Sequence, residues 1–268
     1  MPCLRKTPAP ALRRLESAAP ARTCLCAAVL IAFAGCQTPS PEAKQLADLK
    51  AKVSSLSSDW PNLSRYRADN AALGAPAAGE VRVVFLGDSI TDSWPTTTDY
   101  FKNHHYIGRG ISGQTTPQML ARLREDVIAL EPKVVVILAG TNDVAGNTGP
   151  YDPEATRGYL SSIAELSRAH GIRVVLSSVL PAFDYPWKPG LEPATKIVAL
   201  NAWIKAYAEE NHFVYLDYFD SMAAGNLGMK PELSGDGVHP NAKGYAVMEP
   251  LAEEAVRTAL SQQGAQGP

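Results

Sequence analysis

The chain has 268 residues, enough for one large domain or two small ones, and its 46% hydrophobic and 19% charged content is ordinary for a globular protein. A formal net charge of −2 leaves no basic footprint of the kind that nucleic-acid-binding proteins carry, so no nucleic-acid partner is expected. All four cysteines lie in the first 36 residues, which excludes a disulfide scaffold, a cysteine zinc site and a cysteine nucleophile from the rest of the chain.

Residues 1–35 have the pattern of an export signal. Basic residues precede a short apolar run, 24–34, which leads into Phe33-Ala34-Gly35-Cys36. The run is too short to span a bilayer comfortably, and the motif resembles a bacterial lipoprotein box. On that resemblance, cleavage before Cys36 leaves a lipid-carrying cysteine that anchors an exported cell-envelope protein to a membrane. An ordinary secretory signal and an uncleaved, membrane-anchored segment stay open as alternatives.

Residues 36–58 are rich in Pro, Ser, Ala and Lys and are interpreted as a tether, with a candidate helix over 42–56. Residues 59–79 are predicted to form an N-terminal helix that packs on the domain, with Asp59 as its N-cap and Pro61 in its first turn. The residues expected to bury one face of this helix are Trp60, Leu63, Tyr66 and Leu73.

Residues 80–262 are predicted to form one domain in which strands and helices alternate. Strands separated by long helices imply βαβ crossovers and a mostly parallel sheet covered on both faces. We therefore expect an α/β fold, a three-layer α/β/α sandwich with about five parallel strands. In chain order, the predicted elements are strand 81–86, strand 106–108, helix 116–130, strand 133–139, helix 153–170, strand 172–178, helix 193–211, strand 213–216 and helix 242–260.

The first strand runs directly into Gly87-Asp88-Ser89. A glycine turn followed by a helix start places the hydroxyl of Ser89 at the carboxyl edge of the sheet, near N–H donors. Open α/β sheets bind their ligands at that edge. The stretch predicts a nucleophile at Ser89 and a structural role for Asp88 in holding the turn. Taken alone, it leaves a capped helix start without chemistry equally open.

Three further stretches supply the partners that a serine nucleophile needs. Acyl transfer requires a base, a group that orients the base, and donors for the developing oxyanion. His239 is the candidate base, and Asp236 is the candidate group that fixes its tautomer. The backbone N–H groups of Ser89 and Gly113 and the side-chain amide of Asn142 are the candidate oxyanion donors. Loops that follow parallel strands meet at one edge, which predicts that these groups come together.

These stretches together resemble the SGNH (GDSL-type) hydrolase family over roughly residues 80–260. The matching motifs are Gly87-Asp88-Ser89, Gly110-Ile111-Ser112-Gly113, Gly140-Thr141-Asn142-Asp143 and Asp236-Gly237-Val238-His239, in the family's order. The resemblance implies a flavodoxin-like fold and a catalytic domain at 80–262. It also implies a Ser89 nucleophile, an Asp236–His239 dyad, an oxyanion hole of Ser89, Gly113 and Asn142, and no metal or organic cofactor. Gly108 and Gln114 depart from the commoner Asn and Asp, which puts the substrate preference in doubt.

The resemblance implies a serine esterase, most similar to bacterial platelet-activating-factor-acetylhydrolase-like and carbohydrate-esterase-like members. The expected substrate is a small-molecule or glycan ester, with acetyl as the expected acyl group. A lysophospholipase or lipolytic esterase is the alternative, followed by a non-catalytic envelope lipoprotein that uses the same cleft for binding. Trp94, Tyr185 and Trp187 are the candidate pocket residues that pack on a sugar face or an acyl chain, with loop packing as the bland alternative.

Overall fold

The computed structural model of the protein describes residues 40–262, so the predicted export signal and Cys36 lie outside the described residues. Within the described part, the strands form one sheet in the order β2-β1-β3-β4-β5, and every neighbouring pair is parallel. This is the flavodoxin-like order, and it confirms the predicted α/β fold. The strands are β1 (Val83–Gly87), β2 (Ile107–Gly110), β3 (Val134–Leu138), β4 (Arg173–Ser177) and β5 (Val214–Leu216).

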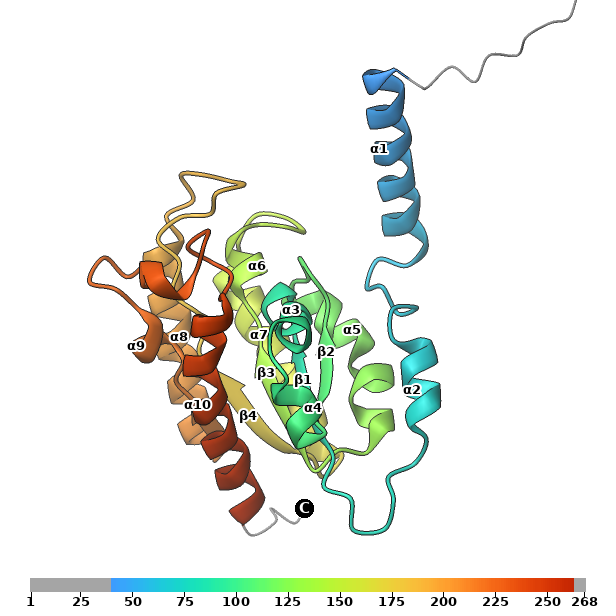
Figure 1. Ribbon diagram of the computed structural model, residues 1–268, viewed down its shortest axis with the longest axis vertical. Coiled ribbons are helices and arrows are strands. Elements are labelled where there is room, and N and C mark those ends of the chain that lie inside the picture. Colours follow the sequence, from blue (N-terminus) through green and yellow to red (C-terminus); the bar gives the residue numbers. More distant parts are fainter. Residues whose placement is uncertain (1–39, 263–268) are drawn as a thin grey trace, which may run out of the picture. The chain divides into compact units, whose positions relative to one another are not determined.

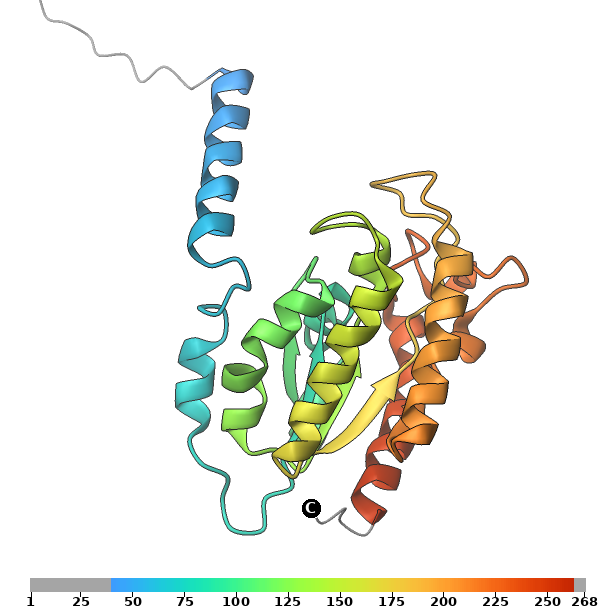
Figure 2. The same ribbon diagram turned by 180° about the vertical axis from the view of Figure 1, so that it is seen from behind.

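Helices cover both faces of the sheet, as expected for a three-layer sandwich. Helices α5, α7 and α8 pack on one face, while α3, α4 and α10 pack on the other (Figure 1). Figure 2, seen from behind, shows α7 in yellow-green and α8 in orange on the first of these faces. The α-helices are α1 (Pro41–Ser58), α2 (Arg67–Leu73), α3 (Ser89–Thr97), α4 (Tyr100–His104), α5 (Thr116–Asp126), α6 (Thr141–Val144), α7 (Pro153–Ala169), α8 (Pro193–Glu210), α9 (Phe219–Met222) and α10 (Ala242–Ser261), and the 3₁₀ turns are η1 (Ile128–Leu130) and η2 (Pro231–Leu233).

The central strands are buried on both faces, which explains their near-continuous apolar sequence. Every residue of β1 and β3 is buried. Along β1, alternate side chains enter opposite cores: Val84 and Leu86 pack with α5 and α7, whereas Val83 and Phe85 pack with α3, α4 and α10. The two cores thus hold β1 rigidly, and its carboxyl end delivers the turn that carries Ser89.

The segment before the sheet differs from its prediction. The Asp59 carboxylate accepts the N–H groups of Leu63 (2.7 Å) and Ser64 (3.0 Å), but it closes a turn and does not begin a long helix. Asn62 has a positive φ of 55°, which is incompatible with a continuous helix, so α2 begins only at Arg67. Of the four apolar residues expected to bury one face, Tyr66 alone is buried, and Trp60 is 38% exposed.

Among residues 40–262, none of the helices is both long enough and apolar enough to cross a membrane.

Candidate active site

The candidate site lies where the strand order reverses direction. Strand β1 continues into the Ser89 turn and α3, and its neighbour β3 continues into Asn142 on α6. On the other side of β1, strand β2 leads into the loop that carries Gly113. In doubly wound sheets, ligands bind at this point outside the carboxyl ends of the strands.

The turn that presents Ser89 is built by its two preceding residues. A methyl group at Gly87 would collide with the side chain of Thr91, so only glycine fits where the strand meets α3. Asp88 is the N-cap of α3, and its Oδ1 accepts the Ile90 N–H at 3.0 Å. Ser89 is therefore the first residue of a helix, and its backbone N–H belongs to the unpaired donors of the first turn.

His239 and Asp236 join Ser89 in a hydrogen-bonded line. The Oγ of Ser89 lies 3.0 Å from Nε2 of His239, and Nδ1 of the same ring lies 2.7 Å from Oδ2 of Asp236. A hydroxyl donating to Nε2 assigns the proton of the neutral ring to Nδ1, which donates to the carboxylate. This geometry is that of a nucleophile, a base and a group that orients the base.

The Asp236 carboxylate is held in place by its own loop. Its Oδ1 accepts the N–H groups of Val238 (2.9 Å) and His239 (2.8 Å), while the Ser234 hydroxyl bridges Oδ1 and the His239 carbonyl. Partial burial opposes ionisation, but the bonds from the His239 ring and from these two N–H groups outweigh it and hold the pKa of Asp236 at about 2. Asp236 is therefore ionised wherever the histidine can act as a base.

Asn142 and Gly113 are joined through Asn147. The Nδ2 of Asn147 donates to Oδ1 of Asn142 (2.9 Å) and to the carbonyl of Gly113 (3.0 Å). Asn142 in turn donates one amide hydrogen to the Gln114 carbonyl at 3.0 Å, which leaves its second hydrogen for a ligand. Gly113 has a φ of +79°, a conformation in which glycine is nearly free of strain. These bonds fix the Asn142 amide and the Gly113 loop relative to each other.

Sequence reasoning did not identify Asn147. In the sequence, Asn147 is only an amide residue five positions after Asn142, and it lies in a loop whose path the sequence does not specify. Nothing in that pattern predicts its bond to Asn142. Ser234 was missed for the same reason, since hydroxyl residues are common in turns. The hydrogen bonds of both residues reach across a loop or between loops, so they become visible only when the loops are placed.

Arg122 connects the ends of β1 and β2 beneath the site. Its fully buried guanidinium donates to the carbonyl oxygens of Gly87 (3.0 Å) and Arg109 (2.9 Å). Its Nε donates to Oε1 of Gln114 at 2.6 Å, directly after Gly113. The Arg122 guanidinium thereby holds the strand that leads to Ser89 and the Gly113 loop together, and charge-assisted bonds of this kind are about twice as strong as neutral ones.

Two buried carboxyl groups support the site from below. Burial raises the pKa of Asp88 to about 7, since only its Oδ1 is hydrogen-bonded and its Oδ2 has no partner among the described residues. Burial also raises the pKa of Asp143 to about 6, against the bonds that its carboxylate accepts from the N–H and hydroxyl of Thr116. Asp88 caps α3 and Asp143 bonds the first residue of α5, and neither carboxylate has a hydrogen bond to Ser89 or His239 among the described residues.

The three aromatic residues predicted to line the pocket differ in their exposure. The Trp187 ring is 48% exposed, lies 5.7 Å from the His239 ring, and stacks on Tyr185 at 5.2 Å. Tyr185 is fully buried and supports Trp187 from beneath, with its hydroxyl bonded to the Thr141 carbonyl at 2.9 Å. Trp187 thus forms a rim beside the candidate base.

Trp94 corrects the prediction, because it belongs to the core and not to a pocket. Its side chain is 1% exposed and stacks between Tyr100 (5.3 Å) and Tyr245 (5.1 Å). It lies on the face of α3 that packs against the sheet, so its closeness to Ser89 along the chain does not bring it into the cleft.

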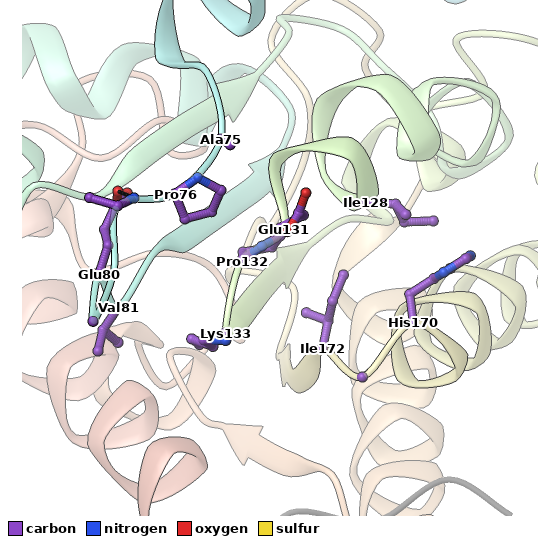
Figure 3. Close-up of a pocket in the computed structure, with 13 residues that line it drawn as sticks. Ala75, Pro76, Glu80, Val81, Ile128, Glu131, Pro132, Lys133, His170 and Ile172 are labelled. Carbon is purple, nitrogen blue, oxygen red and sulfur yellow. Dashed lines mark hydrogen bonds between the residues drawn. The ribbon is translucent and has the colours of Figure 1, made fainter.

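Two small cavities flank the site, and a larger one lies elsewhere. One cavity of about 270 Å³ is lined by Asp236, Tyr185 and Met229; the other, also about 270 Å³, is lined by Asp143 and Trp60. A cavity of about 640 Å³ lies at the opposite edge of the sheet, among the segments that enter β1, β3 and β4 (Figure 3). None of the candidate catalytic residues lines that larger cavity, so it is separate from the site.

Comparison with known proteins identifies the same family as the motifs do. Residues 85–247 match the model of the GDSL-like Lipase/Acylhydrolase family. The chain is 49% identical to a GDSL-like lipase from Bacteroides thetaiotaomicron, over 75% of this chain and 100% of that one, with a TM-score of 0.74. An acetylxylan esterase from Geobacillus stearothermophilus shares the fold, with 20% identity over 66% of this chain and 94% of that one and a TM-score of 0.55.

A curated relative is the uncharacterized lipoprotein YqeF of Bacillus subtilis. The two are 31% identical over an alignment of 130 positions, which covers 41% of this chain and 53% of YqeF. The chain thus spans about half the length of this relative.

Proposed function

The chain belongs to the GDSL-like lipase/acylhydrolase family and is a hydrolase of ester bonds, and from that premise we propose that Ser89 is its nucleophile. The observation that carries the proposal is the line from Ser89 Oγ through His239 to Asp236, with successive distances of 3.0 and 2.7 Å. The roles of the other site residues follow from where they lie around that line.

In the first step, His239 acts as the general base. Its Nε2 takes the hydroxyl proton as Oγ of Ser89 forms a bond to the ester carbonyl carbon, and the π electrons of the carbonyl move onto oxygen. The resulting imidazolium is stabilised by Asp236, whose carboxylate stays ionised throughout because its pKa is about 2.

The negative oxygen of the tetrahedral intermediate accepts hydrogen bonds from N–H donors at the sheet edge. The backbone N–H groups of Ser89 and Gly113 and the free hydrogen of the Asn142 amide form the hole. Because Asn147 and Gln114 already fix the Asn142 amide, its dipole needs no reorganisation when the charge develops.

The intermediate then collapses and the acyl-enzyme is hydrolysed. The bond from carbon to the alcohol oxygen breaks, and the alcohol leaves with the proton held on His239 Nε2. Water gives a proton to the same nitrogen as it attacks the acyl-serine. The carbon–Oγ bond breaks, the acid departs and Ser89 recovers its proton. No step needs a metal or an organic cofactor.

The preferred substrate is an ester of a small acyl group, acetyl first, on a glycan or related exported molecule. The support is the small volume of the flanking cavities and the exposed indole of Trp187, whose flat face suits a sugar ring beside the base that protonates the leaving alcohol. A lipolytic esterase or lysophospholipase is the second candidate. The exposed side chain of Phe183 favours it, because this ring and Met229 give the cavity beside Asp236 an apolar lining that an acyl chain could contact.

We further propose that the enzyme is exported and held at the cell envelope by a lipid on Cys36. The support is the signal-like N-terminus and the lipoprotein named among the relatives. Metabolic labelling with an alkyne fatty acid tests this directly. Label is expected on the full chain, and it should be lost in Cys36→Ser. Equal labelling of both chains would contradict lipidation at Cys36.

One experiment tests the enzymatic proposal and separates the substrate classes. Purified protein is treated with a fluorophosphonate probe, and its rates are measured on acetylated oligosaccharides and on p-nitrophenyl esters of graded chain length. We expect labelling at Ser89 and a preference for acetyl. A rising rate with acyl length selects the lipolytic alternative, and an unlabelled, inactive protein selects the binding lipoprotein.

A further inference from the structure

A second cavity borders the oxyanion loops on the side away from Asp236. Its volume is about 270 Å³, and three aromatic side chains line it: Trp60, Tyr151 and Tyr159. Trp60 and Tyr159 are 38% and 37% exposed. Within the described residues, neither ring stacks on another aromatic ring or lies under a cation. These flat apolar faces are thus open to a ligand.

Trp60 is held in this position by the catalytic domain. Gln118 donates from Nε2 to the Trp60 carbonyl at 2.8 Å, and Gln114 donates from Nε2 to the Pro61 carbonyl at 2.6 Å. Both glutamines are at least nine-tenths buried, so these bonds fix the segment firmly. The hydroxyl of Tyr66 adds a bond to the carbonyl of Gly110. Trp60 therefore precedes the domain in sequence but belongs to the wall of this cavity.

The loop that carries Thr148 lies beside both this cavity and the candidate oxyanion hole. Thr148, which lines the cavity, bonds Thr115 through their hydroxyls at 3.1 Å. The preceding residue, Asn147, holds Asn142 and Gly113. The cavity and the candidate oxyanion donors thus lie on two sides of one short loop, which places the cavity next to the candidate oxyanion hole.

We propose that this cavity is a subsite for one sugar ring of an acylated oligosaccharide, an inference that rests on the esterase function proposed above. The aromatic faces pack on the apolar C–H face of the ring, and polar groups at the edge bind its hydroxyls. Asp152 suits the second task, since its Oδ1 caps α7 while its Oδ2 has no hydrogen-bond partner among residues 40–262.

The lining favours a sugar over an acyl chain. The exposed carboxylate of Asp152 borders the cavity, and an acyl chain laid against it would strip its water without replacing the lost hydrogen bonds. The volume also lies just below the usual range of about 300–1,000 Å³ for ligand pockets, which fits a single ring better than a long chain.

The test measures kcat/KM for acetylated oligosaccharides of xylose, glucose and N-acetylglucosamine, each divided by kcat/KM for p-nitrophenyl acetate. In Trp60→Ala and Tyr159→Ala, the ratio for the best of these sugars is expected to fall about 10-fold, mostly through KM, as loss of an aromatic anchor does. Trp60→Phe keeps an aromatic face and should retain most of the ratio. The matched control is Val198→Ala, which removes an apolar side chain of similar exposure (39%) on α8 and should keep the wild-type ratio.

Two negative results have different meanings. If the wild-type protein cleaves p-nitrophenyl acetate but Trp60→Ala leaves every sugar ratio unchanged, the subsite is refuted and the esterase function stands. If the wild-type protein cleaves no ester and Ser89 takes no fluorophosphonate label, the proposed function itself fails. Circular dichroism and thermal melting of each variant show whether a changed ratio comes from misfolding.

Discussion

The Oγ of Ser89 lies 3.0 Å from Nε2 of His239, although 150 residues of chain separate them. Ser89 stands at the start of α3 after the first strand, whereas His239 stands in the loop that leads into the last helix, α10. Helix α10 packs on the same face of the sheet as α3, and the Tyr245 hydroxyl of α10 bonds the Ile90 carbonyl at 2.7 Å. The packing of these two helices therefore brings His239, the proposed base, to Ser89, the proposed nucleophile.

We expect Ser89→Ala to lower kcat on p-nitrophenyl acetate by about 10⁴- to 10⁶-fold, and Asp236→Asn by about 10⁴-fold through loss of the correct histidine tautomer. Stopped or continuous spectrophotometric assays measure both. The rate that remains in Ser89→Ala depends on the proposed oxyanion hole and not on the histidine. The double variant Ser89→Ala, Asp236→Asn should therefore be little slower than Ser89→Ala alone. An active Ser89→Ala protein would remove this residue from the mechanism.

Asn142→Ala is expected to reduce kcat by about 100- to 1,000-fold with little change in KM, since an oxyanion donor acts mainly in the transition state. Asn147→Ala should cause a smaller loss, because the Asn142 amide remains but loses the bond that orients it. In the Asn142→Ala background, Asn147→Ala should cost less than it does alone, because only its bond to the Gly113 carbonyl remains to be lost, and a double-mutant cycle on kcat measures this coupling. Additive losses would show that Asn147 acts by another route.

The raised pKa of Asp88 predicts that the free energy of unfolding depends on pH. Its pKa is raised from 3.8 to about 7 in the folded protein, so the folded state binds a proton that the unfolded state has released between these values. The stabilisation that this proton provides is complete below pH 3.8 and is lost as pH rises to about 7. Asp236 shifts the opposite way, to about 2, and so contributes slope mainly below about pH 5.

Urea unfolding of wild type and Asp88→Asn between pH 4 and 7 isolates this effect, because the other groups, including Asp143 and His239, are common to both proteins. Relative to wild type, the variant should gain up to about 1.4 kcal/mol in unfolding free energy for each pH unit. A difference that stays flat across this range would show that Asp88 does not titrate there.

Substitution of Trp94 should lower stability, whereas substitution of Trp187 should change catalysis. Trp94→Ala removes a core side chain between Tyr100 and Tyr245 and should cost about 3–5 kcal/mol in unfolding free energy. Trp187→Ala removes an exposed ring beside His239, so it should change stability little and alter kcat/KM and substrate preference. Chemical denaturation and steady-state kinetics on both variants check this contrast. An unstable Trp187→Ala would indicate that its stacking on Tyr185 holds the loop.

The motifs identified the family and the class of ester hydrolase well because they are local. Gly87, Asp88 and Ser89 form one turn, and Asp236 and His239 form another, so each group carries its geometry within a few residues. The alternation of apolar runs and helical spacing likewise predicted five parallel strands, and the sheet confirms this. Signals of this kind depend on the period of burial, which is written along the chain.

Other parts of the site could not be found this way. Trp94 follows the nucleophile by one and a half turns of helix and was expected in the pocket, but which face of α3 meets the sheet depends on the packing of the whole domain. The helix expected from Asp59 is replaced by a turn, because Gln114 and Gln118 bind the carbonyls of Pro61 and Trp60. These partners lie more than fifty residues away in the chain.

Sequence alone predicts the strand and helix alternation, the turn at Ser89 and the Asp236–His239 pair. Each depends on contacts between near neighbours, which residue types largely decide. The fold is needed to see that Asn147 orients Asn142, that Arg122 ties β1 to β2, and that Trp60 lines a cavity next to the candidate oxyanion loops. Those contacts form between loops from different strands, and a loop's path is set by the cores beneath it and not by its own residues.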